Sequence, residues 1–160
     1  MSASWVIRQE WNIDITKLGA PDFESYGKAL FICANGDGKI TPPEREWILG
    51  YFAAAGYPDS IIEMLSTYDG SGNIDEFVKS SVPTQQSIRT LVYDAIRACS
   101  ADGEFNAGER AMVVRMAAQV GLGADDVAKL ESAYNAVVAA AKVRVEAAYP
   151  GGVPEAFRAS

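Results

Sequence analysis

Hydrophobic residues recur with helical spacing along most of the chain. The clearest pattern lies between residues 88 and 99, where apolar side chains follow i, i+3, i+4, i+7 and i+8 through Ile88, Leu91, Val92, Ala95, Ile96 and Cys99. A second face of this kind runs through Phe23, Tyr26, Leu30 and Ala34. No segment of useful length alternates with the two-residue period of a strand. The pattern therefore predicts an all-α fold with about seven to eight helices.

A spacing of 65 residues relates two parts of the chain. The segment Leu30–Leu65 recurs as Ala95–Leu130, and each copy carries an Asp-Gly pair with a glutamate seven residues after the aspartate. Such a spacing indicates one helix–acidic loop–helix unit used twice. We expect a single domain over residues 1–160, with pseudo-symmetric repeats over about 22–66 and 84–131. A connector over 67–83 joins them, a long last helix runs to about residue 148, and the tail 150–160 is loosely held.

Strong signals for helix starts follow each acidic loop. Thr41 with Glu44, and Asn106 with Glu109, have the spacing of a capping box, in which the first side chain and the glutamate bond each other's backbone N–H groups. Gly56 is placed to end the first of these helices in a left-handed conformation. A short helix in the connector is expected to end at Pro83.

Composition excludes several classes of function. The net charge is −7 and no Lys/Arg cluster is present, so we expect no nucleic-acid partner. The sequence shows no membrane span and no signal peptide, so we expect a cytoplasmic protein. Histidine is absent, which removes the commonest general base and transition-metal ligand. Cys33 and Cys99 are best explained as small buried hydrophobes, while a disulfide or a thiolate metal pair stays open.

The acidic loops have the character of oxygen-only cation sites. With Gly38 at position 6 of a twelve-residue calcium loop, Asn35, Asp37 and Glu44 take positions 3, 5 and 12, and Cys33 stands where an aspartate is expected. Gly103 gives the second loop the same register. The candidate ligands are Asn35, Asp37, Glu44, Ser100, Asp102 and Glu109. We predict weak binding of a divalent cation, with Ca²⁺ or Mg²⁺ favoured; the alternative is that the glutamates serve only as helix caps.

Both loops resemble the signature of the tellurite-resistance TerB family, whose members carry helix–(A/S)xDGxφxxxE–helix units. The resemblance rests on residues 34–40 with Glu44 and residues 100–105 with Glu109, and it covers the flanking helices over about 22–148. It implies an all-α fold with internal pseudo-symmetry, metal-coordinating acidic residues and a role in the stress response to tellurite. It also implies protein partners, since members of the family act as hubs for complexes. Homo-oligomerisation and peripheral association with a membrane surface stay open.

The leading hypothesis is a non-enzymatic, cation-binding stress protein that acts as an interaction module. A degenerate EF-hand sensor is the alternative, but such a sensor exposes a Met-rich groove on binding calcium, and this chain has few methionines. A carboxylate enzyme that uses a Mg²⁺-like ion would need an open coordination position and a nearby base. The lack of histidine and of a phosphate-binding glycine-rich loop argues against that third reading.

Overall fold

The computed structural model of this protein describes residues 4–35, 38–101, 103 and 105–158, and this part of the chain is helical without strands. The prediction of an all-α fold is confirmed. The α-helices are α1 (Trp5–Trp11), α2 (Ala20–Ala34), α3 (Pro42–Ala55), α4 (Asp59–Ser66), α5 (Ile74–Ser80), α6 (Val82–Gln86), α7 (Ile88–Cys99), α8 (Ala107–Gln119) and α9 (Ala124–Ala148). A 3-10 turn, η1 (Glu155–Phe157), follows them.

The described residues hold nine α-helices, against the seven or eight expected. One extra helix is α1, which forms before the first repeat. The other arises at Pro83, which does not end the connector helix as expected. Instead, α5 ends at Ser80 and Pro83 lies in the first turn of α6. Proline is well accommodated there, because the first N–H groups of a helix have no partner within the helix.

Local capping sets the starts of the helices after the acidic loops, as the sequence predicts. The Glu44 N–H donates to Thr41 Oγ1 (3.4 Å), while Glu44 Oε2 accepts from the Thr41 N–H (2.6 Å). Asn106 Oδ1 likewise accepts from the N–H of Glu109 (3.1 Å). Gly56 ends α3 with φ +86°. Helices α3 and α8 begin 65 residues apart, and so do α4 and α9.

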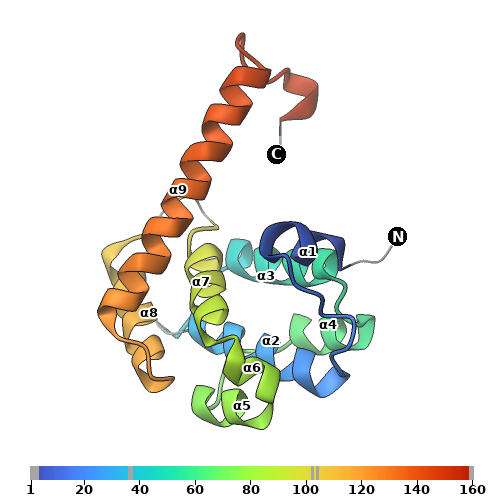
Figure 1. The fold of residues 1–160 in the computed structure, drawn as a ribbon, viewed down its shortest axis with the longest axis vertical. Coiled ribbons are helices and arrows are strands. Elements are labelled where there is room, and N and C mark those ends of the chain that lie inside the picture. Colours follow the sequence, from blue (N-terminus) through green and yellow to red (C-terminus); the bar gives the residue numbers. More distant parts are fainter. Residues whose placement is uncertain (1–3, 36–37, 102, 104, 159–160) are drawn as a thin grey trace.

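Helix α2 is the central element of the core. It packs against α4, α5, α6, α7 and α8, and Leu30 and Phe31 on it are fully buried. Gly27 allows α2 and α4 to approach closely, because a Cβ at this position would lie 2.5 Å from Leu65 Cδ1. Figure 1 shows α2 enclosed by the other helices.

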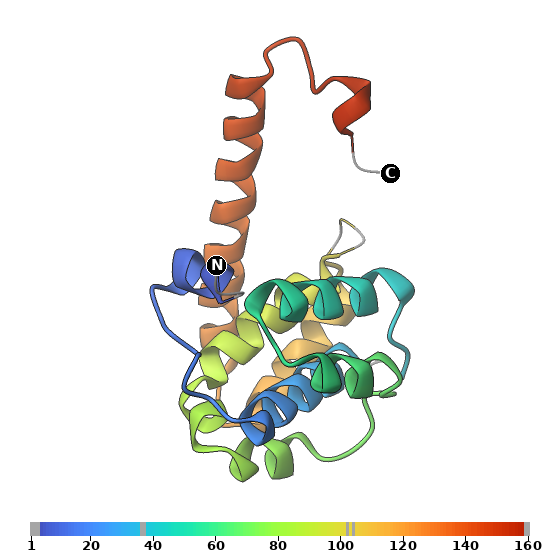
Figure 2. The same ribbon diagram turned by 90° about the vertical axis from the view of Figure 1, so that its right-hand side faces the viewer.

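Helices α1 to α8 form a rounded body from which α9 projects (Figures 1 and 2). The first half of α9 lies against α7 and α8, and its second half extends away from them. Despite the 25 residues of α9, no described helix is both long enough and apolar enough to cross a bilayer.

Candidate functional site

The first acidic loop connects α2 to α3 and is braced by the connector. Asn35 caps the end of α2, and its Nδ2 donates to the Gly70 carbonyl (3.3 Å). The close approach requires glycine at position 70, because a Cβ there would lie 2.7 Å from the Phe31 carbonyl oxygen. Gly38, with φ +91°, turns the chain, and its N–H donates to the Asn35 carbonyl (2.8 Å). The loop therefore has a defined turn at the glycine that the calcium-loop register places at position 6.

Glu44 closes this loop from the third position of α3. Its side chain is buried, with 6% exposure, and Oε2 accepts from both the N–H and the Oγ1–H of Thr41, at 2.6 and 2.7 Å. A carboxylate has about four lone-pair positions on its two oxygens, so capping and cation binding are chemically compatible at one residue.

The second acidic loop repeats this geometry between α7 and α8. Ser100 caps α7, and its Oγ–H donates to the Ile96 carbonyl (2.7 Å). Gly103 has φ +99°, and its N–H donates to the Ser100 carbonyl (3.0 Å), as Gly38 does to Asn35. Glu109 is half-buried, and its Oε2 accepts from the Asn106 N–H (2.8 Å). The two loops thus share a turn, a capped glutamate and a register.

The structure places four of the six predicted ligands, Asn35, Glu44, Ser100 and Glu109, at these helix ends. Asp37 and Asp102 lie outside the described residues. Within the described part of the chain, no three carboxylate or thiol side chains gather closely enough to hold a metal ion. The metal site therefore stays a prediction, and it depends on the aspartate of each loop.

The cysteines lie in the core near these loops. Burial raises the pKa of the Cys33 thiol to about 12, so the sulfur is protonated at neutral pH. Cys99 is buried at the matching end of α7. A protonated, buried thiol is a poor metal ligand, which favours the reading of Cys33 as a small apolar residue.

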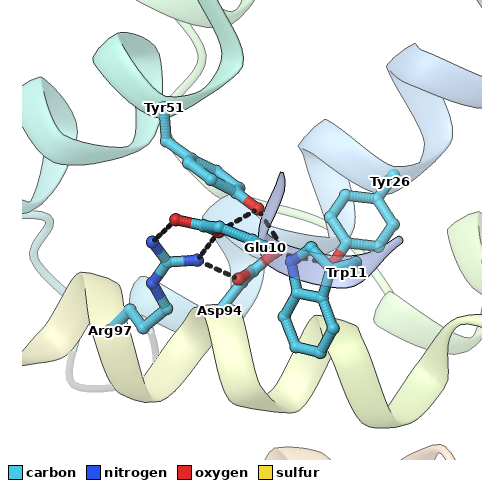
Figure 3. A network of polar contacts seen from close by, with 6 residues as sticks. All are labelled: Glu10, Trp11, Tyr26, Tyr51, Asp94 and Arg97. Carbon is cyan, nitrogen blue, oxygen red and sulfur yellow. Dashed lines mark hydrogen bonds and ion pairs between the residues drawn. The ribbon is translucent and has the colours of Figure 1, made fainter. Parts of the chain in front are cut away.

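A second polar cluster, which the sequence analysis did not identify, joins the N-terminal helix to the body. We call it the Arg97 network, and its members are Glu10, Trp11, Tyr26, Tyr51, Asp94 and Arg97 (Figure 3). The Arg97 guanidinium donates to both carboxylate oxygens of Glu10 (3.0 and 3.2 Å) and to Asp94 Oδ1 (3.3 Å). The Tyr26 hydroxyl donates to Asp94 Oδ2 (2.9 Å). These contacts link α1, α2 and α7.

Aromatic rings enclose the guanidinium and extend the network to α3. The Arg97 Cζ lies 4.5 Å from the ring centre of Tyr51 and 4.9 Å from that of Trp47, within the range of cation–π attraction. Trp11 Nε1–H donates to the Tyr51 hydroxyl (3.3 Å). The network therefore fixes α1 against the body through directional bonds as well as apolar packing.

Burial dominates the electrostatics of this network. Asp94 is 1% exposed, and burial raises its pKa to about 6, although Arg97 and the Tyr26 hydroxyl act to lower it. Burial disfavours the Arg97 charge as well, but the hydrogen bond to Glu10 and the charge of Asp94 outweigh that cost and raise its pKa. The sequence did carry a signal, since Asp94 interrupts the apolar run Leu91–Ile96 and an arginine follows three residues later.

Comparison with known proteins gives one informative match. The crystal structure of a tellurite resistance protein from Nostoc punctiforme superimposes with a TM-score of 0.88 and 31% sequence identity, over 96% of this chain and 95% of that chain. No protein-family model and no curated protein matches the sequence. The similarity extends over nearly the whole length of both chains.

Proposed function

The chain belongs to the tellurite-resistance TerB family, and from this premise we propose that it is a non-enzymatic stress-response protein whose two acidic loops bind a divalent cation. In this proposal the cation controls the protein's interaction with partner proteins. The observation that carries the stress-response assignment is the whole-chain similarity to a tellurite resistance protein at 31% identity.

The matching geometry of the loops supports the cation. Capping boxes account for Glu44 and Glu109, but they do not require a left-handed glycine six residues before each glutamate. Gly38 and Gly103 both occupy that position, with φ +91° and +99°. A turn of this kind directs short oxygen ligands and a peptide carbonyl around a hard cation.

The ligand chemistry supports weak binding. Each loop offers two carboxylates, Asp37 with Glu44 or Asp102 with Glu109, and affinity rises with the charge of the ligand set. We expect dissociation constants on the order of 10⁻⁴ to 10⁻³ M for a loop that acts alone. The absence of histidine from the sequence supports a binding role over an acid–base catalyst.

Calorimetric titration with Ca²⁺ and Mg²⁺, together with thermal unfolding, tests this proposal. A cation present at about 100 times its dissociation constant adds about 2.7 kcal/mol to the free energy of unfolding, which raises Tm by roughly 5 to 10 °C for a domain of this size. Asp37→Asn should reduce that shift. Asp69→Asn removes a carboxylate from the connector turn, outside both loops, and should leave the shift unchanged.

Substitution of the glutamates separates capping from coordination. Glu44→Gln keeps a side-chain oxygen that can accept from the Thr41 N–H, but it removes the charge that a hard cation requires. Without cation the variant should therefore have nearly the same Tm as the wild type. Addition of the cation should raise its Tm by less than it raises that of the wild type. Glu109→Gln is the parallel variant in the second loop. If both single variants and the double variant keep the full cation-dependent shift, neither loop is the site.

A further inference from the structure

A pocket lies where the N-terminal part of the chain covers the body. It has a volume of about 80 Å³, and side chains from α1, α2, α3, α6 and α7 line it. Ile15 and Leu18, in the segment that joins α1 to α2, line it as well. That segment runs along the outside of the body (Figure 2), so the pocket is formed between it and the helices beneath. None of the described residues of the two acidic loops lines this pocket.

Aromatic rings form much of the pocket wall. They belong to Trp11, Phe23, Tyr26, Tyr51 and Tyr57. The faces of such rings carry partial negative charge, so they attract a cation as well as apolar groups. The ring of Tyr51 shows this attraction within the molecule, since the Arg97 Cζ lies 4.5 Å from its centre. An alkyl group with a positive charge would therefore fit this wall.

Polar side chains line the pocket along one face of α7. Ser87 at the start of this helix, Thr90 and Asp94 are separated by three and four residues, which places them on the same side. Asp94 Oδ1 accepts from Arg97, and Oδ2 accepts from the Tyr26 hydroxyl (Figure 3). A carboxylate has about four lone-pair positions, so Asp94 can accept a further hydrogen bond from a ligand.

The charged side chains of the pocket wall are both acidic. They are Asp22 and Asp94, and no lysine or arginine is among the described residues that line the pocket. Arg97 offsets only part of this charge, because its guanidinium is shared between Asp94 and Glu10. Burial raises the pKa of Asp94 to about 6, and a cation beside this carboxylate would favour its ionised form. The pocket is therefore suited to a cation and unsuited to an anion.

A buried hydroxyl group in the wall lacks a partner from the protein. Thr84 is 1% exposed, and within the described part of the chain its Oγ1 has no hydrogen-bond partner. No fully enclosed side-chain oxygen among the described residues lacks a partner, so Thr84 Oγ1 must contact open space, and Thr84 lines the pocket. Buried hydroxyls are nearly always hydrogen-bonded. The partner of this one therefore has to come from the contents of the pocket.

The size and chemistry of the pocket limit the ligand. A cavity of about 150 Å³ in another protein binds benzene, so a pocket of about 80 Å³ holds roughly three or four non-hydrogen atoms. A bare metal ion would leave the aromatic wall unused, and within the described part of the chain no three carboxylate or thiol groups gather to hold one. An alkylammonium ion combines an apolar chain for the rings with charged N–H donors for the carboxylate.

We propose that this pocket binds a small alkylammonium ion. The alkyl chain packs against the aromatic rings, and the N–H groups donate to Asp94 and to the hydroxyl of Thr90, which lies one helical turn from it. The site uses no residue of the acidic loops, so its test is independent of the divalent cation.

Titration of the full chain with propylammonium chloride tests the site. At about pH 7.5 and about 0.15 M NaCl, which screens exposed charges, binding is followed by NMR through the indole N–H signal of Trp11, a residue of the pocket wall. Affinity for a ligand of this size is limited to a dissociation constant on the order of 10⁻⁵ M, so we expect a value on the order of 10⁻⁴ M. Propan-1-ol has the same size but no charge, and it should bind at least about 10-fold more weakly.

Three variants locate the binding. Asp94→Asn should raise the dissociation constant of propylammonium by about 10-fold or more, and Thr90→Val, which keeps the shape of the side chain and all charges, by about 3-fold. Asp125→Asn is the matched control, since it removes an exposed carboxylate outside the pocket and should change the constant by less than about 2-fold. Circular dichroism checks that each variant folds. The proposal is overturned if propylammonium does not bind, if propan-1-ol binds equally well, or if Asp94→Asn weakens binding no more than Asp125→Asn does.

Discussion

Replacement of Asp94 by asparagine tests the energetics of the Arg97 network. The carboxylate is 1% exposed and accepts from the Tyr26 hydroxyl and the Arg97 guanidinium. Asparagine keeps an acceptor for Tyr26, and Arg97 keeps its two bonds to Glu10. The variant should therefore fold, and it differs from the wild type chiefly in lacking a titratable group at this position.

The pKa of Asp94 gives the size and the sign of the effect. Burial raises it from 3.8 to about 6, a difference of about 2 units, and one unit corresponds to 1.36 kcal/mol, so the effect is about 3 kcal/mol. Because the folded state binds this proton more tightly than the unfolded state, the stabilising contribution is complete below about pH 4. It is lost as the pH rises through 6. Relative to Asp94→Asn, the wild type should gain about 2 to 3 kcal/mol between neutral pH and pH 4.

Urea unfolding, followed by circular dichroism at several pH values from about 4 to 7.5, measures this difference. Carboxyl groups common to both proteins cancel in the comparison. Asp126→Asn is a control of opposite sign, because the hydrogen bond from Arg89 lowers the pKa of Asp126 and the wild type should lose its advantage as the pH falls. A difference between the wild type and Asp94→Asn that is the same at every pH would refute the reasoning.

Three further predictions concern stability and can be measured by chemical or thermal unfolding. Gly27→Ala should lower the free energy of unfolding by about 1 to 3 kcal/mol, because the new Cβ would lie 2.5 Å from Leu65 Cδ1. Gly50→Ala, in an open helical position, should raise it by up to about 1 kcal/mol, and equal effects of the two variants would contradict the close approach of α2 and α4. Glu44→Ala should lower the free energy of unfolding by about 1 kcal/mol, and Glu44→Gln by only a few tenths of that amount, since only alanine removes the side-chain oxygen that accepts from the Thr41 N–H. Arg45→Lys should lower the free energy of unfolding by about 1 to 2 kcal/mol, because the guanidinium donates to three backbone carbonyls at the end of α4. A change within experimental error would show that these hydrogen bonds contribute little to stability.

The sequence by itself determined the features that depend on near neighbours in the chain. Thr41 and Glu44 are three residues apart, so their reciprocal bonds form within one helical turn whatever surrounds them. The same holds for Asn106 with Glu109. The helical class, the ends of the helices at the acidic loops and the positions of four predicted ligands all follow from such local rules.

Only the tertiary structure decided the contacts between distant residues. Glu10 and Arg97 are 87 residues apart, and Asp94 acquires its raised pKa from the helices that bury it. The spacing of residues along the chain gives neither the distance between two remote side chains nor the burial of a carboxylate, and these two quantities set the ion pair and the pKa. The same limit applies to α9. The sequence predicts its length, but whether another element covers its second half depends on where the eight earlier helices, α1 to α8, leave space. That choice is made by the packing of the whole body, and it leaves the second half of α9 extended beyond the other helices (Figures 1 and 2).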